Sequence, residues 1–246
     1  MFLPSKPYLA YHTEIVLNEK SKNNVYVFFV TSTIIIIIIF IPRRLRLYNS
    51  TWKLILSDLY RYEGNTSLKI FIKNFFWNPG FKCSFYSRVC KCLSKSKNPF
   101  VVLVFYFVRI FYRHNRIKYG ISLPYQANIK SGFYIGHFGT IVINSEVTIG
   151  KNCNVSQGVT IGVSNRGKYK GNPTIGDNVY IGPGAKIFGA IKVGNNVAIG
   201  ANCVVSKDVP DNAVVVGIPG RIISCKGSTG YINHIDYNFF DGANKN

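Results

Sequence analysis

Acidic side chains are scarce in this sequence. Only 10 of its 246 residues are Asp or Glu, against 30 that are Lys or Arg, so the formal net charge is +20. So few carboxylates argue against an enzyme built on clustered acidic metal ligands. The excess of positive charge instead favours polyanionic neighbours, such as nucleic acid, a phosphate-bearing cofactor or an anionic membrane face.

The positive charge is concentrated in the N-terminal half of the chain. Residues 1–128 contain 19 basic and 4 acidic residues, whereas residues 129–246 contain 11 and 6. Proximity to a membrane surface, or a solvated charged face, accounts for such an excess. No stretch interleaves aromatic and basic residues as nucleic-acid-binding motifs do, so we expect no nucleic acid as a partner.

Metal-binding patterns are also missing. Six cysteines are present, but none forms a Cys-x-x-Cys pair, and Cys90-Lys91-Cys92 has no nearby histidine with which to bind zinc. We therefore expect no metal site. Cys153 and Cys203 occupy apolar positions of a repeat, so they are expected to be reduced core residues of a cytosolic protein.

One long apolar run lies near the N-terminus. Residues 25–41 are seventeen uncharged residues, and a basic cluster at Arg43, Arg44 and Arg46 follows. This length is near the lower limit for a membrane anchor, and the cluster would keep that side in the cytoplasm. A signal peptide fits poorly because small residues for cleavage are missing, and an unstructured leader is a third reading. Residues 1–24 stay an unassigned leader.

A helical segment is predicted over residues 51–119. Apolar side chains recur at three- and four-residue spacing, the Asn-Pro-Gly sequence at 78–80 interrupts the pattern, and further helices are expected at 81–93 and 99–116. The last helix carries the run FVVLVFYFVRIFY, which is too short to span a membrane. Core packing is its simplest role, and an interface or a membrane surface are the alternatives.

A six-residue period dominates the chain from Ile129 onward. Reading in sixes from Ile175 gives IGDNVY, IGPGAK, IFGAIK, VGNNVA, IGANCV and VSKDVP, and the same frame runs from Ile143 through INSEVT, IGKNCN and VSQGVT. The first position is always Ile or Val, and Gly occupies the second position in five of the nine units. Ile129 and Ile135 continue the pattern upstream with a two-residue offset.

This period predicts a left-handed parallel β-helix. Each hexad would form a short strand and a turn, and three hexads would complete one triangular coil with the aliphatic residues stacked inside. Glycine and asparagine suit the turns because both tolerate a positive φ. We therefore expect a mainly β protein in which a small helical segment precedes the β-helix at 121–223. A loop at 163–174 interrupts the hexads, and a C-terminal tail covers 224–246.

The repeats and their flanking motifs resemble the hexapeptide-repeat acyltransferases, and within them the serine acetyltransferase-like branch. The resemblance extends from about Leu54 to Tyr231. It is carried by the segments DLYRYEG (58–64), NPGF (78–81), YIGHFGTIVIN (134–144), SQGVTIG (156–162), GNPTIGDNVYIGPGAKIFG (171–189) and AIGANCVVSKDVPDNAVVVGIPGRII (198–223). It implies a homotrimer that binds acetyl-CoA between neighbouring subunits and transfers the acetyl group to a hydroxyl.

The resemblance makes His137 the catalytic histidine. An alcohol is a weak nucleophile at neutral pH, so acetyl transfer to it requires a general base. Two positions depart from the family pattern. Ser122 replaces the carboxylate that orients the histidine, and a hydroxyl can orient the ring without stabilising its charged form. Asn172 replaces a histidine that handles serine, and it is the candidate substrate-binding residue.

The resemblance assigns two groups of residues to acetyl-CoA. Residues at coil corners would follow the pantetheine arm, and basic or hydroxyl-bearing residues would meet the nucleotide end and its phosphates. The corner residues are Gly162, Pro183 and Ala201, and the others are Arg166, Ser206, Lys207 and Arg221. The loop at 163–174, which contains Arg166, is expected to close as a lid.

Three functions fit these observations. The leading expectation is an acetyl-CoA-dependent O-acetyltransferase that acts on a hydroxyl of a cell-surface saccharide or its precursor. Ser122, Asn172 and the membrane-prone N-terminal half favour that acceptor over free serine. The second is serine O-acetylation for cysteine biosynthesis. The third is a non-enzymatic basic scaffold that kept the β-helix and lost the chemistry.

Overall fold

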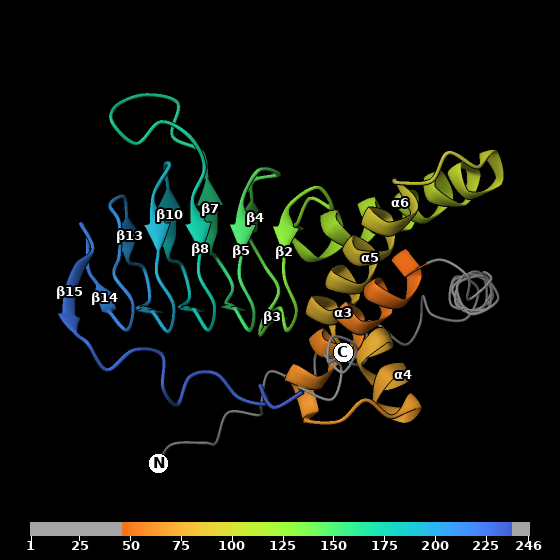
Figure 1. Ribbon diagram of the computed structural model, residues 1–246, viewed down its shortest axis with the longest axis horizontal. Helices are drawn as coiled ribbons and strands as arrows, with labels where there is room; N and C mark the ends of the chain where they lie inside the picture. The colour runs from red at the N-terminus through yellow and green to blue at the C-terminus, as the bar shows by residue number, and fades with distance from the viewer. Residues whose placement is uncertain (1–45, 238–246) are drawn as a thin grey trace, which may run out of the picture. The chain divides into compact units, whose positions relative to one another are not determined.

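The structure is a computed structural model that describes residues 46–237 (Figure 1). Within this range four α-helices precede fifteen short strands. The apolar run at 25–41 and the leader at 1–24 lie outside the described residues, and so does the last part of the C-terminal tail, 238–246. None of the helices in the described range has both the length and the hydropathy that crossing a bilayer requires.

The helices begin and end at identifiable signals. They are α3 (Arg46–Glu63), α4 (Leu68–Trp77), α5 (Pro79–Leu93) and α6 (Pro99–Tyr119). The side chains of Asn78 and Asn98 accept hydrogen bonds from the first backbone N–H groups of α5 and α6, and a proline follows each cap. Gly120 ends α6 in the left-handed conformation, with φ at 62°. This stop lies beyond the predicted end at residue 116.

One face of α6 is not part of the core. Phe105, Val108 and Tyr112 are buried on its inner face. Other apolar side chains of the same helix are 66–72% exposed: Phe100, Leu103, Ile110 and Ile117. Core packing, the simplest expectation for this apolar run, therefore holds for one side of the helix only.

The strands form three sheets, one for each face of a triangular coil. Sheet A contains β1 (Ile121–Ser122), β4 (Ile141–Ile143), β7 (Thr160–Gly162), β10 (Lys186–Phe188) and β13 (Val204–Val205). Sheet B contains β2 (Asn128–Ile129), β5 (Thr148–Ile149), β8 (Thr174–Ile175) and β11 (Lys192–Val193). Sheet C contains β3 (Tyr134–Ile135), β6 (Asn154–Val155), β9 (Tyr180–Ile181), β12 (Ala198–Ile199), β14 (Val214–Val216) and β15 (Arg221–Ser224). Each strand from β1 to β10 pairs in parallel with the third strand after it, β12 pairs in parallel with β14, and β15 then returns antiparallel to β14. The predicted left-handed β-helix is confirmed.

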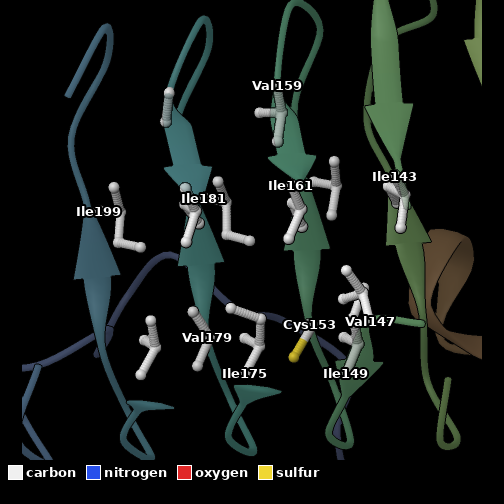
Figure 2. Packing of buried hydrophobic residues seen from close by; sticks show 14 of the residues in the cluster. Ile143, Val147, Ile149, Cys153, Val159, Ile161, Ile175, Val179, Ile181 and Ile199 are labelled. Carbon is white, nitrogen blue, oxygen red and sulfur yellow. The ribbon is translucent and has the colours of Figure 1, made fainter. Parts of the chain in front are cut away.

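Aliphatic side chains at the first and fifth hexad positions fill the interior of the β-helix (Figure 2). Ile143 pairs in register with Ile161, and Ile161 with Ile187, so equivalent hexad positions stack from coil to coil. Full burial of each such side chain contributes about 1.5–3 kcal/mol. Cys153 and Cys203 are fully buried in this ladder, which confirms their expected role as core residues.

An asparagine column lines one corner of the coils. Asn152, Asn178, Asn196 and Asn212 all adopt a positive φ, between 54° and 60°. The side-chain amide of each of the first three donates to the side-chain oxygen of the next, over 2.9–3.2 Å. Asparagine tolerates this backbone conformation better than other residues with a side chain, and here it also links adjacent coils.

The DLYRYEG motif in α3 fastens the helices to the first coils of the β-helix. The Arg61 guanidinium donates to the Gly132 carbonyl oxygen over 2.8 Å and to the Asn154 side-chain oxygen over 2.7 Å. The Asp58 carboxylate accepts from the backbone N–H of Phe133 over 2.8 Å. The helices therefore cap the N-terminal end of the solenoid, where its hydrophobic interior would otherwise be open.

The described part of the predicted tail, 224–237, runs back along the β-helix toward α3 (Figure 1). The Ser228 hydroxyl donates to the Asn178 carbonyl oxygen over 2.7 Å, and Arg61 Nε donates to the Asn233 carbonyl oxygen over 2.7 Å. This segment is thus a packed strap across several coils.

Candidate functional site

His137 projects from an enlarged turn between sheets C and A. Eight positions separate the paired residues Ile135 and Ile143, whereas six separate their partners Val155 and Ile161 in the next coil. The two extra residues are the physical cause of the offset in the hexad pattern. They lift the turn out of the regular coil, and the His137 side chain is exposed to solvent.

The backbone of this turn needs a glycine. Gly139 has a φ of 110°, and nothing lies within 4 Å of where its Cβ would be, so conformation and not space requires glycine there. Thr140 follows with a φ of 52°. Between His137 and Gly139, the centre of the Phe138 ring lies 5.9 Å from that of the Tyr119 ring in α6, edge to face. Gly139 and Thr140 therefore set the backbone conformation of the turn, and Tyr119 in the last turn of α6 holds it in place.

Ser122 lies in β1, the first strand of sheet A. Its hydroxyl oxygen accepts a hydrogen bond from Arg116 Nη2 over 2.9 Å. Within the described part of the chain, this arginine and not His137 is its hydrogen-bond partner. The orienting role of Ser122 thus stays a prediction, and a serine oxygen has a second lone pair that such a role would use.

An open cleft of about 540 Å³ separates α6 from sheet A. We call it the arginine cleft, because Arg109, Arg113 and Arg116 line it together with Ser122 and Val142. Its wall also contains Tyr112, whose hydroxyl donates to the backbone carbonyl of Leu123. Burial raises the pKa of the Tyr112 hydroxyl above its ordinary value, so this phenol stays neutral.

Two of the corner residues assigned to acetyl-CoA lie on the same edge of sheet A as the His137 turn. Backbone hydrogen bonds connect that edge from coil to coil, including one of 2.8 Å from the N–H of Asn202 to the Pro183 carbonyl oxygen. Ala201 directly precedes Asn202 in this corner. Gly162 differs, because it ends β7 at the opposite edge of sheet A, where it pairs with Phe188.

A second cleft, of about 440 Å³, lies at the C-terminal end of the β-helix. We call it the C-terminal cleft. It brings together Ser206, Lys207 and Arg221, three residues that the sequence assigned to the nucleotide end of acetyl-CoA. Asp208 also lines it, and its carboxylate accepts from the backbone N–H of Lys192 over 2.8 Å. The cleft therefore contains two exposed cations and a hydroxyl. The one carboxylate beside them already accepts a backbone hydrogen bond.

The loop between β7 and β8 is closed at its base. Ser164 and Gly171 exchange two backbone hydrogen bonds of 2.9 Å, and the carbonyl oxygen of Tyr169 accepts from the N–H of Ala190 over 2.8 Å. Arg166 is exposed near the tip and does not line the C-terminal cleft. The predicted loop is one residue too long, because Thr174 already belongs to β8.

Asn172 lies at the base of this loop. Its side-chain Nδ2 donates to Glu146 Oε2 over 2.7 Å, whereas its Oδ1 is buried and has no hydrogen-bond partner among the described residues. Asn172 follows the end of β7, while His137 precedes β4, so the two residues lie at opposite edges of sheet A. A single chain does not bring them together.

Sequence reasoning missed Arg116 and Glu146 as site residues. The sequence alone indicated no role for Arg116 in the site, yet the turn at Gly120 reverses the chain and places Ser122 against it. One signal for Arg116 was available in the sequence: it lies six positions before Ser122, and the helix-ending Gly120 lies between them. Among residues 46–237 no group of three or more His, Cys, Asp or Glu side chains is arranged to hold a metal ion.

Known proteins match this chain in both sequence and fold. The bacterial transferase hexapeptide (six repeats) family matches residues 172–207. The serine acetyltransferase of Synechococcus elongatus is 36% identical over 149 residues, which cover 61% of this chain and 59% of that protein. The serine acetyltransferase of Bacillus subtilis is 40% identical over 141 residues, or 57% of this chain and 62% of that protein. The chain thus spans about six-tenths of the length of the curated relatives it matches.

Solved structures of serine acetyltransferases are similar to this chain in fold. The Neisseria gonorrhoeae serine acetyltransferase in complex with serine matches with a TM-score of 0.57 and 26% identity, over 72% of this chain and 73% of that one. The Brucella abortus serine acetyltransferase in complex with coenzyme A matches with a TM-score of 0.56 and 26% identity, over 71% of this chain and 66% of that one.

These comparisons overturn the leading expectation about the acceptor. The matching proteins are serine acetyltransferases, so the saccharide acceptor and a role in polysaccharide biosynthesis are wrong, and the second expectation, serine, is favoured. The expectation relied on the membrane-prone N-terminal half, and on Ser122 and Asn172 as departures from a serine enzyme. Both positions nevertheless keep a polar group that neighbouring side chains hold in place, through Arg116 and Glu146.

Proposed function

We propose that this chain, whose sequence and fold are similar to those of serine acetyltransferases, transfers the acetyl group of acetyl-CoA to the hydroxyl of L-serine. The observation that carries this proposal is the exposed His137 on its enlarged turn, within a fold and sequence shared with serine acetyltransferases. A general base on a fixed turn is what O-acylation of an alcohol requires.

We propose that His137 takes the proton from the serine hydroxyl as the oxygen attacks the thioester carbonyl carbon. The carbon–sulfur bond then breaks, and His137 returns the proton to the departing CoA thiolate. Gly139 permits the backbone conformation of the turn that carries His137, and the Phe138–Tyr119 contact holds this turn in place, which supports a positioned base. Ser122 is proposed to orient the imidazole with the lone pair that Arg116 does not use. When bound, acetyl-CoA supplies the activated acyl group as a thioester.

The residues of the C-terminal cleft suit the phosphates of acetyl-CoA. Lys207 and Arg221 provide two cations and Ser206 a hydroxyl, and all three line one cleft, so the donor set fits a polyanionic group. We propose that these residues hold the nucleotide end. Gly162, Pro183 and Ala201 are proposed to border the pantetheine arm, and Arg166 to add a further cation from the loop between β7 and β8.

Asn172 is proposed to bind the ammonium group of serine. Its Oδ1 is a buried acceptor that has no partner among the described residues, and the Glu146 carboxylate lies against its Nδ2. An acceptor oxygen beside a carboxylate suits a cationic donor.

The proposal is tested with purified protein, acetyl-CoA and L-serine. We expect O-acetylserine to form, measured by mass spectrometry, and no product from L-alanine, which has the same backbone charges but no hydroxyl. Folded protein that forms no O-acetylserine would contradict the proposed function.

We further propose that the active assembly is a homotrimer. His137 and Asn172 lie at opposite edges of sheet A, so contact between neighbouring subunits is what would bring one subunit's histidine to another's loop. Partly exposed Val142 and Phe188 on this sheet support such a contact. We expect light scattering to give three times the chain mass of 27.7 kDa, and a stable active monomer would contradict the trimer.

A further inference from the structure

The arginine cleft is a concentration of positive charge beside the first coil. Arg109, Arg113 and Arg116 follow one another at spacings of four and three, so they share one face of α6. All three line the cleft of about 540 Å³, which has the size of a small-molecule site. None of its lining residues is Asp or Glu.

The protein itself does not neutralise this charge. The ion pairs among the described residues are Lys73 with Glu63 and Arg88 with Asp58, and neither involves an arginine of the cleft. Like charges at these helix spacings repel one another. An anionic ligand would remove that repulsion, and an arginine side chain is the group best suited to bind an oxyanion through paired N–H donors.

Arg116 is held in place but not fully satisfied. Its Nη2 donates to Ser122, and its guanidinium carbon lies 5.6 Å from the centre of the Tyr112 ring. Its Nε, by contrast, is buried and has no hydrogen-bond partner among the described residues. A fixed guanidinium with an unused donor is typical of a binding residue, since a purely structural arginine would use that donor within the protein.

The cleft adjoins the turn that carries His137. Gly120 lines the cleft, and a Cβ at that position would lie 3.1 Å from the backbone nitrogen of Thr140. The Gly120 carbonyl oxygen also accepts from the N–H of Ile141 over 2.9 Å. A ligand group in the cleft is therefore next to the segment that supplies the general base.

We propose that the arginine cleft is an oxyanion subsite that holds the carboxylate of the acceptor beside the His137 turn, with Arg116 as its central residue. This inference rests on the proposed function, because L-serine supplies the carboxylate. It divides recognition of the acceptor between two places: the arginine cleft for the carboxylate, and Asn172 with Glu146 for the ammonium group.

Steady-state kinetics of an Arg116→Gln variant test the subsite. Hydrogen bonds to charged groups predict that KM for L-serine rises about 10-fold to 100-fold while KM for acetyl-CoA stays near the wild-type value. Arg116→Lys should restore part of the loss, because it keeps the charge but not the paired donors. Lys118→Gln is the matched control: it removes one positive charge from the same helix outside the cleft, and it should leave both KM values unchanged. Equal effects of Arg116→Gln and Lys118→Gln would overturn the proposal.

A second variant and a substrate without a carboxylate guard against misfolding as the explanation. Arg113→Gln, whose side chain is exposed, should also raise KM for L-serine. L-serinamide lacks the carboxylate, so wild type and Arg116→Gln should use it equally poorly. A wild-type preference for serinamide over serine would overturn the proposal.

Anion binding separates failure of this proposal from failure of the proposed function. Acetate, added at constant ionic strength, should raise the melting temperature of the wild type and of Lys118→Gln but not of Arg116→Gln. If wild type forms no O-acetylserine but shows this pattern, the proposed function fails and the oxyanion subsite stands. If phosphate stabilises in this pattern and acetate does not, the cleft holds a phosphate, and the assignment to a carboxylate is wrong.

Discussion

Replacement of His137 by alanine is expected to lower kcat for O-acetylation of L-serine by about 10²-fold to 10⁴-fold, the usual contribution of a general base. The serine hydroxyl has to lose its proton as it attacks, and the motif at 134–144 contains no other His, Asp or Glu that could accept it. Rates of O-acetylserine formation at saturating acetyl-CoA measure the effect. KM for acetyl-CoA should change little, because the residues proposed to bind its phosphates lie in the C-terminal cleft.

His114→Ala is the matched control for this variant. His114 is also exposed, but it lies on α6 and does not line the arginine cleft, so its loss should leave kcat unchanged. A His137→Ala enzyme with a kcat near the wild-type value would exclude His137 as the base. A folded His137→Ala protein that loses affinity for acetyl-CoA would instead assign the residue to binding.

The β-helix could be predicted from the sequence because each six-residue unit corresponds to one strand and one turn of the coil. Each coil repeats one pattern of inward aliphatic residues and turn-forming Gly or Asn, so an isoleucine such as Ile161 specifies both a strand and its inward face. Even the irregularity was visible as an offset between Ile135 and Ile143. What the offset does, namely enlarge the turn that exposes His137, required the pairing of the strands.

The surroundings of the site could not be predicted in the same way. The bond from Arg116 to Ser122 depends on how α6 ends at Gly120 and on the direction of a long flexible side chain, and no periodic pattern encodes either. The strap at 224–237 contains no repeat, so it was expected only as a tail. Its contacts use backbone carbonyl oxygens, which are present in every sequence: the Ser228 hydroxyl donates to that of Asn178 in a distant coil, and that of Asn233 accepts from Arg61 in α3.

The structural role of the DLYRYEG motif could not be predicted from the sequence either. Sequence comparison marks it as part of a resemblance, but only the structure shows that Asp58 joins α3, α5 and the β-helix. Its carboxylate accepts from Arg88 Nε and Nη2 over 3.1 Å each, from the Ser84 hydroxyl, and from the backbone N–H of Phe133 over 2.8 Å. The Arg88 guanidinium in turn donates to the carbonyl oxygens of Ile129 and Lys130. Asp58 is 1% exposed and Arg88 is 6% exposed, so the pair is almost fully removed from water.

Asp58→Ala is therefore expected to lower the free energy of unfolding by about 3–5 kcal/mol, since it leaves the Arg88 cation buried without its counter-charge. Lys73→Ala is the control, because Lys73 pairs with Glu63 over 3.0 Å at the surface, where an ion pair contributes about 0–1 kcal/mol. Urea denaturation followed by circular dichroism measures both changes. Similar losses in the two variants would show that the Asp58 network contributes no more than a surface pair. A large loss of unfolding free energy in Asp58→Ala alone would show that this buried charge stabilises the attachment of the helices to the β-helix.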